Sequence, residues 1–111
     1  MTALTLPEPL ATYFTAAPSL DGAEAIVRCF SPQALVKDEG RSHVGHDAIR
    51  AWQRQASSQY RYTSEPFAVA PTDGGCLVTS RVTGNFPGSP VDLRYHFQLA
   101  GGLITSLEIT L

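Results

Sequence analysis

The hydrophobic pattern of this 111-residue chain changes near Ser58, and that change most constrains its fold. Before it, apolar residues recur at every third and fourth position, as on one face of an α-helix. After it, apolar and polar residues alternate to the end, as on a β-strand with one buried face. The clearest alternation runs from Val91 to Leu99. The chain therefore predicts helices followed by an antiparallel sheet, which is an α+β domain.

Three helices are expected in the first half. The first begins near Pro7 and Pro9, because proline is tolerated in a first helical turn, and Pro18 ends it. Its apolar face is Leu10, Tyr13, Phe14 and Ala17. The second begins at Asp21, which forms a capping-box pattern with Glu24, and its apolar stripe is Ala23, Ile26, Val27 and Phe30.

Pro32 ends the second helix in this interpretation, and Ala34 to Val36 form a short strand. A polar loop then continues from Lys37 to Gly45. The third helix runs from His46 to about Ser57 or Ser58, with an apolar face of Ile49, Trp52 and Ala56.

Four further strands fill the rest of the chain. The first is Tyr60 to Ala70, in which Pro66 marks an edge or a bulge. The glycine- and proline-rich segments 72–75, 87–90 and 101–102 predict the turns between them. The other strands are residues 76–86, 91–99 and 103–111.

Composition excludes several classes of function. The length predicts a single domain over residues 1–111. A formal net charge of -2 with no basic run gives no footprint for nucleic acid or an anionic membrane. Charged residues make up only 16% of the chain, which favours a homodimer. Cys29 and Cys76 are too few for a disulfide framework and are expected to be reduced thiols. The N-terminal segment resembles neither a signal peptide nor a membrane anchor. A cytoplasmic location is therefore expected.

Asp38 is the acidic residue best placed for chemistry. It ends an apolar strand just before a loop and a new helix, a position that points into the cleft between sheet and helices. An apolar pocket disfavours the charged form of a carboxylic acid, which makes it a better proton acceptor near neutral pH. The competing interpretation is a loop aspartate that caps backbone amides or pairs with Lys37 or Arg41.

The order of elements, together with four segments of sequence, resembles the SnoaL-like and ketosteroid-isomerase-like branch of the nuclear transport factor 2 superfamily. The matching residues are the segments 21–30, 34–38 and 95–99, together with Gly45, Ala48, Ile49, Trp52, Gly101, Gly102 and Ile104. The resemblance implies a cone-shaped domain with three N-terminal helices packed on a curved, mostly antiparallel sheet. It also implies a pocket between the layers and a homodimer through the outer sheet face.

The resemblance places three residues at functional positions. Asp38 falls where ketosteroid isomerases keep their general-base aspartate. Tyr13 lies within one residue of their hydrogen-bond-donating tyrosine, although Phe14 is the direct match without a gap. Tyr95 replaces the protonated aspartic acid that is their second oxyanion donor. It also replaces the pocket histidine of SnoaL-type cyclases, whose acid/base aspartate falls at Ile109, with Glu108 pointing the other way.

Two functional hypotheses arise from these positions. In the first, the chain is a cofactor-independent isomerase, cyclase or dehydratase that acts on an apolar carbonyl compound. Asp38 then moves the proton, Tyr13 and Tyr95 hold the enolate oxygen, and the pocket wall is Phe14, Trp52 and Phe97. In the second, the same fold is a non-catalytic ligand-binding or dimerisation module, and the tyrosines are core aromatics.

Other chemistry finds little support in the sequence. His43 and His46 stand near Asp38 and Asp47, but no further His or Cys cluster supports a metal site, and none is expected. The glycine pairs lie in hairpin turns and not in a phosphate-binding loop, so no cofactor is expected either. His96 is expected on the polar face of its strand, toward a dimer partner or solvent.

Overall fold

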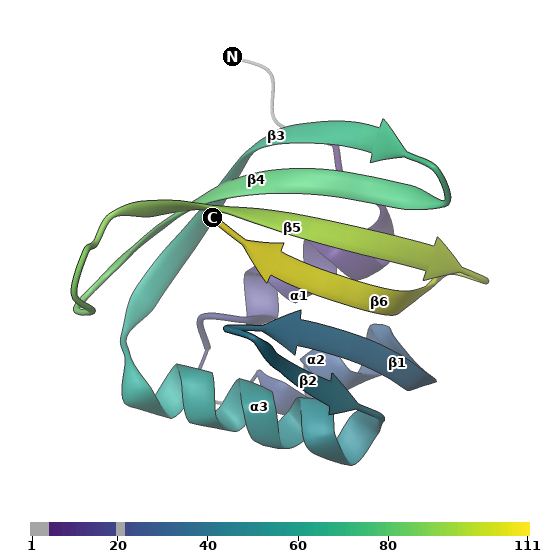
Figure 1. The fold of residues 1–111 in the computed structure, drawn as a ribbon, viewed down its shortest axis with the longest axis horizontal. Helices are drawn as coiled ribbons and strands as arrows, with labels where there is room; N and C mark the ends of the chain where they lie inside the picture. The colour runs from purple at the N-terminus through teal and green to yellow at the C-terminus, as the bar shows by residue number, and fades with distance from the viewer. Residues whose placement is uncertain (1–4, 20–21) are drawn as a thin grey trace.

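The computed structural model describes residues 5–19 and 22–111, and in it three helices pack against one face of a curved six-stranded sheet (Figure 1). The strand order is β2-β1-β6-β5-β4-β3. All neighbouring strands are antiparallel except β1 and β6, which run parallel. This architecture confirms the predicted α+β fold with three helices on a mostly antiparallel sheet.

The helices are α1 (Glu8–Ala16), α2 (Ala23–Arg28) and α3 (His46–Gln59). α1 has proline in its first turn, as expected, and buries Leu10, Tyr13 and Phe14. α3 begins after Gly45, whose φ of 86° is one that glycine adopts without strain. Asp21, the expected N-cap of α2, lies outside the described residues, and the Glu24 side chain bonds Arg50.

The strands are β1 (Phe30–Asp38), β2 (Arg41–Val44), β3 (Tyr62–Thr72), β4 (Gly75–Gly84), β5 (Val91–Ala100) and β6 (Leu103–Thr110). The last four agree with the sequence prediction to within a few residues. Pro66 lies on the edge strand β3, and the β3–β4 register shifts between Pro66 and Ala68. The expected edge position and bulge are therefore both confirmed.

The segment between α2 and α3 corrects the sequence interpretation. α2 ends at Arg28, and Phe30 is the first residue of β1 instead of the last apolar residue of the helix. Pro32 does not end a helix but lies inside β1. It is tolerated there because the β1–β6 register is irregular between Phe30 and Leu35, so its missing N–H breaks no ladder.

The expected polar loop from Lys37 to Gly45 contains the strand β2. β1 and β2 form a hairpin around Glu39 and Gly40, whose φ angles are 53° and 75°. Both values are positive, as a two-residue turn of this hand requires. The hairpin brings Asp38 to the end of β1 opposite Arg41, beside the first half of α3.

The core lies between α1, α2 and the inner face of the sheet. Tyr13 and Phe14 of α1 meet Tyr95 and Phe97 of β5 with ring centroids 5.0–6.1 Å apart in edge-to-face contacts. Such pairs stabilise a core beyond the area that they bury. The cluster holds α1 on the centre of the sheet and fixes where the Tyr13 side chain points.

Candidate functional site

A cavity of about 700 Å³ lies between α3, the inner face of the sheet and the β4–β5 loop. Aromatic rings form much of its wall: Tyr13, Trp52, Tyr60, Tyr62, Phe86 and Tyr95. Aliphatic side chains complete it, chiefly Val82, Val91, Leu93 and Ile109. This size and this apolar lining with few polar groups are typical of small-molecule sites.

Asp38 is half-buried on the cavity wall and accepts a hydrogen bond from Trp52. The indole Nε1–H donates to Oδ2 at 3.0 Å, which joins the end of β1 to the middle of α3. Asp38 makes no ion pair with Lys37 or Arg41 among the residues that the structure describes. The carboxylate therefore faces the cavity with one oxygen anchored, and Oδ1 remains for a ligand.

Tyr13 and Tyr95 reach the same cavity from α1 and β5. Their side chains are 3% and 6% exposed. Burial raises the pKa of Tyr13 well above its ordinary value, and the neighbouring Tyr95, Tyr62 and Asp38 raise it further. Burial also raises the pKa of Tyr95, with Tyr62 and Asp38 adding and the Ser64 hydroxyl opposing. Both phenols are therefore protonated donors at neutral pH.

The Tyr13 hydroxyl is open to the cavity. It makes no hydrogen bond to any of the described residues. Every fully enclosed side-chain polar atom of the described residues has a partner, so this hydroxyl must be accessible from the cavity. A buried hydroxyl without a partner is costly unless water or a ligand satisfies it. Tyr13 is thus the donor that a bound carbonyl group would meet first.

Gln53 and Tyr62 are two cavity residues that sequence reasoning missed. The Gln53 amide donates to the Ala17 carbonyl at 2.6 Å, and the Tyr62 hydroxyl donates to the same oxygen at 2.9 Å. Together they tie α3 and β3 to the end of α1. The signal that could have found Gln53 is its spacing of four from Ile49 and from Ser57, since all three are buried.

Phe14 and Phe97, the expected substrate contacts, lie elsewhere. They are buried in the core behind Tyr13 and Tyr95 and are not part of the cavity wall. They can act on the site only by positioning the two tyrosines. Trp52, the third expected contact, does line the cavity.

The histidines have structural contacts outside the cavity. His46 bonds the Phe30 carbonyl through Nε2 at 2.9 Å, and the His43 ring lies 6.0 Å from the Trp52 ring. His96 is exposed on the outer sheet face and bonds the Thr110 hydroxyl at 3.2 Å. In the described part of the chain, no three His, Cys, Asp or Glu side chains cluster as metal ligands would.

None of the described helices has the length and apolar character needed to span a membrane.

Comparison with known proteins identifies the superfamily. No protein-family model matches the sequence, and no curated protein matches it. A crystal structure from Sinorhizobium meliloti, described as a "putative polyketide cyclase", is 39% identical, with 95% of each chain covered and a TM-score of 0.88. The chain belongs to the nuclear transport factor 2-like, ketosteroid-isomerase-like superfamily. The resemblance read from the sequence is thereby confirmed.

More distant structures share the superfamily fold. A Catenulispora acidiphila protein of ketosteroid isomerase-like fold, solved in complex with trimethylamine, is 16% identical over 96% of this chain and 87% of its own, with a TM-score of 0.84. SalBIII, an epoxide hydrolase/cyclase-like enzyme with a role in pyran ring formation in salinomycin, is 21% identical over 92% and 86%, with a TM-score of 0.76. At these identities the likeness concerns the fold alone.

Within the superfamily fold, the last strand has a defined register. Ile109 lies opposite Tyr95 and lines the cavity, whereas Glu108 is exposed and lies opposite His96. The β5–β6 register shifts between Gln98 and Leu99, and this irregularity does not bring Glu108 inward. Of the acidic positions weighed from the sequence, Asp38 is the one on the cavity wall. Glu39 joins it at the rim.

Proposed function

We propose that this protein is a cofactor-independent enzyme that transfers a proton on a largely apolar, carbonyl-bearing small molecule. The observation that carries the proposal is the meeting of three groups on one cavity of about 700 Å³: the Asp38 carboxylate and the side chains of Tyr13 and Tyr95. A base and hydrogen-bond donors in a water-poor site are what enolisation needs.

In this mechanism Asp38 removes a proton from the carbon next to the carbonyl group. The electron pair moves onto the carbonyl oxygen, and Tyr13 donates a hydrogen bond to that oxygen, assisted by Tyr95. Because burial raises the pKa of both phenols, they stay protonated while negative charge develops beside them. The Trp52 indole holds Oδ2 of Asp38, so that Oδ1 is directed at the substrate.

The fate of the enolate decides the reaction class. Return of the proton to a different carbon is isomerisation, attack of the enolate carbon on a second carbonyl is cyclisation, and loss of a neighbouring hydroxide as water is dehydration. The relative described as a "putative polyketide cyclase" supports cyclisation as the first reaction to assay. All three begin with the same proton transfer.

The test is solvent deuterium exchange. Purified protein is incubated in D2O with 4-tert-butylcyclohexanone, and loss of the α-proton signals is followed by NMR. We expect exchange above the buffer rate, and Asp38→Asn should slow the enzymatic rate by about a hundredfold or more. Exchange that continues unchanged in Asp38→Asn would overturn the role of this carboxylate.

A non-catalytic binding module is the second candidate function. It is favoured by the internal bonding of the cavity, since Asp38 bonds Trp52, and both Gln53 and Tyr62 bond Ala17. Polar groups whose hydrogen bonds are made within the protein can shape a ligand site without taking part in a reaction. Ketone binding without any enhanced exchange in the wild-type protein would select this alternative.

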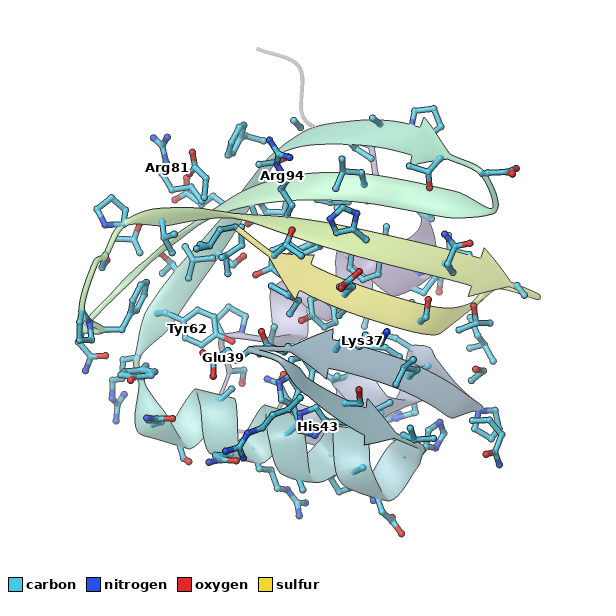
Figure 2. All side chains as sticks on the ribbon, in the orientation of Figure 1. Lys37, Glu39, His43, Tyr62, Arg81 and Arg94 are labelled. Carbon is cyan, nitrogen blue, oxygen red and sulfur yellow. The ribbon has the colours of Figure 1, made fainter. Side chains whose placement is uncertain are left out.

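We further propose that the outer sheet face forms a homodimer. Figure 2 shows Arg81 and Arg94 projecting from this side of the sheet. Arg81 lies 5.8 Å from the Phe67 ring, which is 51% exposed, and it pairs with Asp92 at 2.9 Å. Light scattering should give a dimer mass for the wild type, and Phe67→Glu should shift it toward the monomer. A wild-type monomer at high concentration would refute the dimer.

A further inference from the structure

The cavity wall carries negative charge without a compensating cation. Asp38 and Glu39 line it, and no lysine, arginine or histidine among the described residues does. Neither carboxylate forms an ion pair with another described residue. The basic side chains nearby, Lys37 and Arg41, border a separate hollow of about 250 Å³ at the β1–β2 turn, which these carboxylates also border. Glu39 and Tyr62, both labelled in Figure 2, line this cavity.

The remaining wall is suited to a positive charge. Six aromatic rings line the cavity, and the faces of such rings attract ammonium groups. Burial raises the pKa of Tyr13, Tyr62 and Tyr95, so these rings stay neutral phenols. At the mouth, Tyr60 and Phe86 meet edge to face with centroids 5.9 Å apart.

One polar group on a nearly buried side chain, the Tyr13 hydroxyl, also faces the cavity. The Tyr13 hydroxyl lacks a partner among the described residues, although the side chain is only 3% exposed. Gln53 is 1% exposed, and its amide nitrogen donates a hydrogen bond to the Ala17 carbonyl oxygen. The charged groups of the wall are both carboxylates, which accept hydrogen bonds and favour a ligand that donates them.

From these observations we infer that the cavity takes an organic cation, namely a protonated amine attached to an apolar body. The ammonium group would lie between Glu39 and the aromatic rings near the mouth, and its N–H groups would donate to the carboxylate oxygens. This inference deepens the proposed function, because it rests on the same cavity and makes the substrate an amino ketone. The carbonyl end would then reach Tyr13 and Asp38.

A charge series of small ligands tests the inference. Benzylamine, benzyl alcohol and benzoate share one ring and carry a charge of about +1, 0 and −1 at pH 7. Binding is followed by the indole N–H signal of Trp52, the single tryptophan of the chain, in NMR titrations. We expect benzylamine to bind about tenfold more tightly than benzyl alcohol, and benzoate to bind most weakly.

Two charge-neutralising variants sharpen the result. Glu39→Gln should weaken benzylamine binding severalfold and leave benzyl alcohol unchanged. The matched control is Glu65→Gln, which removes the same charge from the exposed edge strand β3 and should change neither affinity. Added salt should reduce the difference in affinity between benzylamine and benzyl alcohol, because salt screens the attraction between charges.

The outcomes separate this inference from the proposed function. Equal or tighter binding of benzyl alcohol at Trp52 overturns the cation site but leaves an apolar ligand site intact. An equal loss of amine affinity in Glu39→Gln and Glu65→Gln also overturns it, because the attraction would then be a property of net charge. If no probe moves the Trp52 signal, the ligand site of the proposed function fails as well.

Discussion

The indole N–H of Trp52 donates a 3.0 Å hydrogen bond to Asp38, and this contact joins α3 to the end of β1 at the cavity wall. It explains how a carboxylate without an ionic partner keeps a fixed direction. A hydrogen bond to a charged group is stronger than one between neutral groups. The contact should therefore both stabilise the fold and orient the Asp38 carboxylate in the cavity.

We expect Asp38→Ala and Trp52→Phe to be non-additive in stability. The double mutant should be less destabilised than the sum of the single mutants, with a coupling energy of about 1 kcal/mol. Urea unfolding followed by circular dichroism measures all four proteins. Additive losses would show that the two side chains do not interact in solution.

Gln53→Leu should destabilise the fold by about 1–2 kcal/mol. The substitution removes the 2.6 Å bond to the Ala17 carbonyl, which then depends on Tyr62 alone. The control is Gln55→Leu on the exposed side of the same helix, which should change the unfolding free energy by less than about 0.5 kcal/mol. Equal effects of the two substitutions would contradict the buried role of Gln53.

The structure shows why the helix-sheet order was predictable and the site only partly so. β5 alternates strictly, with Tyr95 and Phe97 buried, so its pattern fixed its inner face. Gln53 is polar in a helix that otherwise bears many polar residues, and its burial depends on the Ala17 carbonyl, thirty-six positions away. The bond itself leaves no local pattern, so the spacing of four from Ile49 was the one hint in the sequence that Gln53 is buried.

β2 was missed for a different reason. Its four residues, Arg41 to Val44, lack an apolar alternation because the strand lies at the edge of the sheet and is mostly exposed. The turn before it contains Glu39 at a φ of 53°, where Asn, Asp or Gly would have indicated a hairpin. Asp38 was found nevertheless, because an acidic residue that ends an apolar strand is visible whether a loop or a hairpin comes after it.

Tyrosine ionisation provides a test of burial at high pH. The folded-state pKa values of Tyr13, Tyr62 and Tyr95 are raised above the ordinary value of 10.0, chiefly by burial. The folded state thus holds these protons more tightly than the unfolded state, and stability should fall as the pH rises above about 10.

Absorbance near 295 nm should show that Tyr13, Tyr62 and Tyr95 resist ionisation while the protein is folded. The transition should then coincide with the loss of helical circular dichroism. Ionisation of Tyr13, Tyr62 and Tyr95 near pH 10 while the protein remains folded would contradict the enclosed positions of these hydroxyls.

The α2–α3 contact should weaken in acid. Glu24 accepts a hydrogen bond from the Arg50 guanidinium, and this bond lowers the pKa of Glu24 below its ordinary value of 4.5. The pair therefore stabilises the fold above about pH 4.5, and the contribution is lost as the pH falls through the lowered pKa.

We accordingly expect Glu24→Gln to lower the melting temperature at pH 7 and to have little effect near pH 3. Thermal unfolding at several pH values measures this difference, and Glu65→Gln serves as the exposed control. A melting-temperature difference that stays constant from pH 7 to pH 3 would argue against the ion pair.

The most direct measurement of the site as a whole is the single indole N–H resonance of Trp52. If its proton is bonded to a carboxylate on an open cavity wall, Asp38→Ala should move the resonance upfield. Benzylamine or 4-tert-butylcyclohexanone should also shift it in the wild type, in a saturable manner. A resonance that responds neither to Asp38→Ala nor to either ligand would contradict both the Asp38–Trp52 bond and the ligand site built around it.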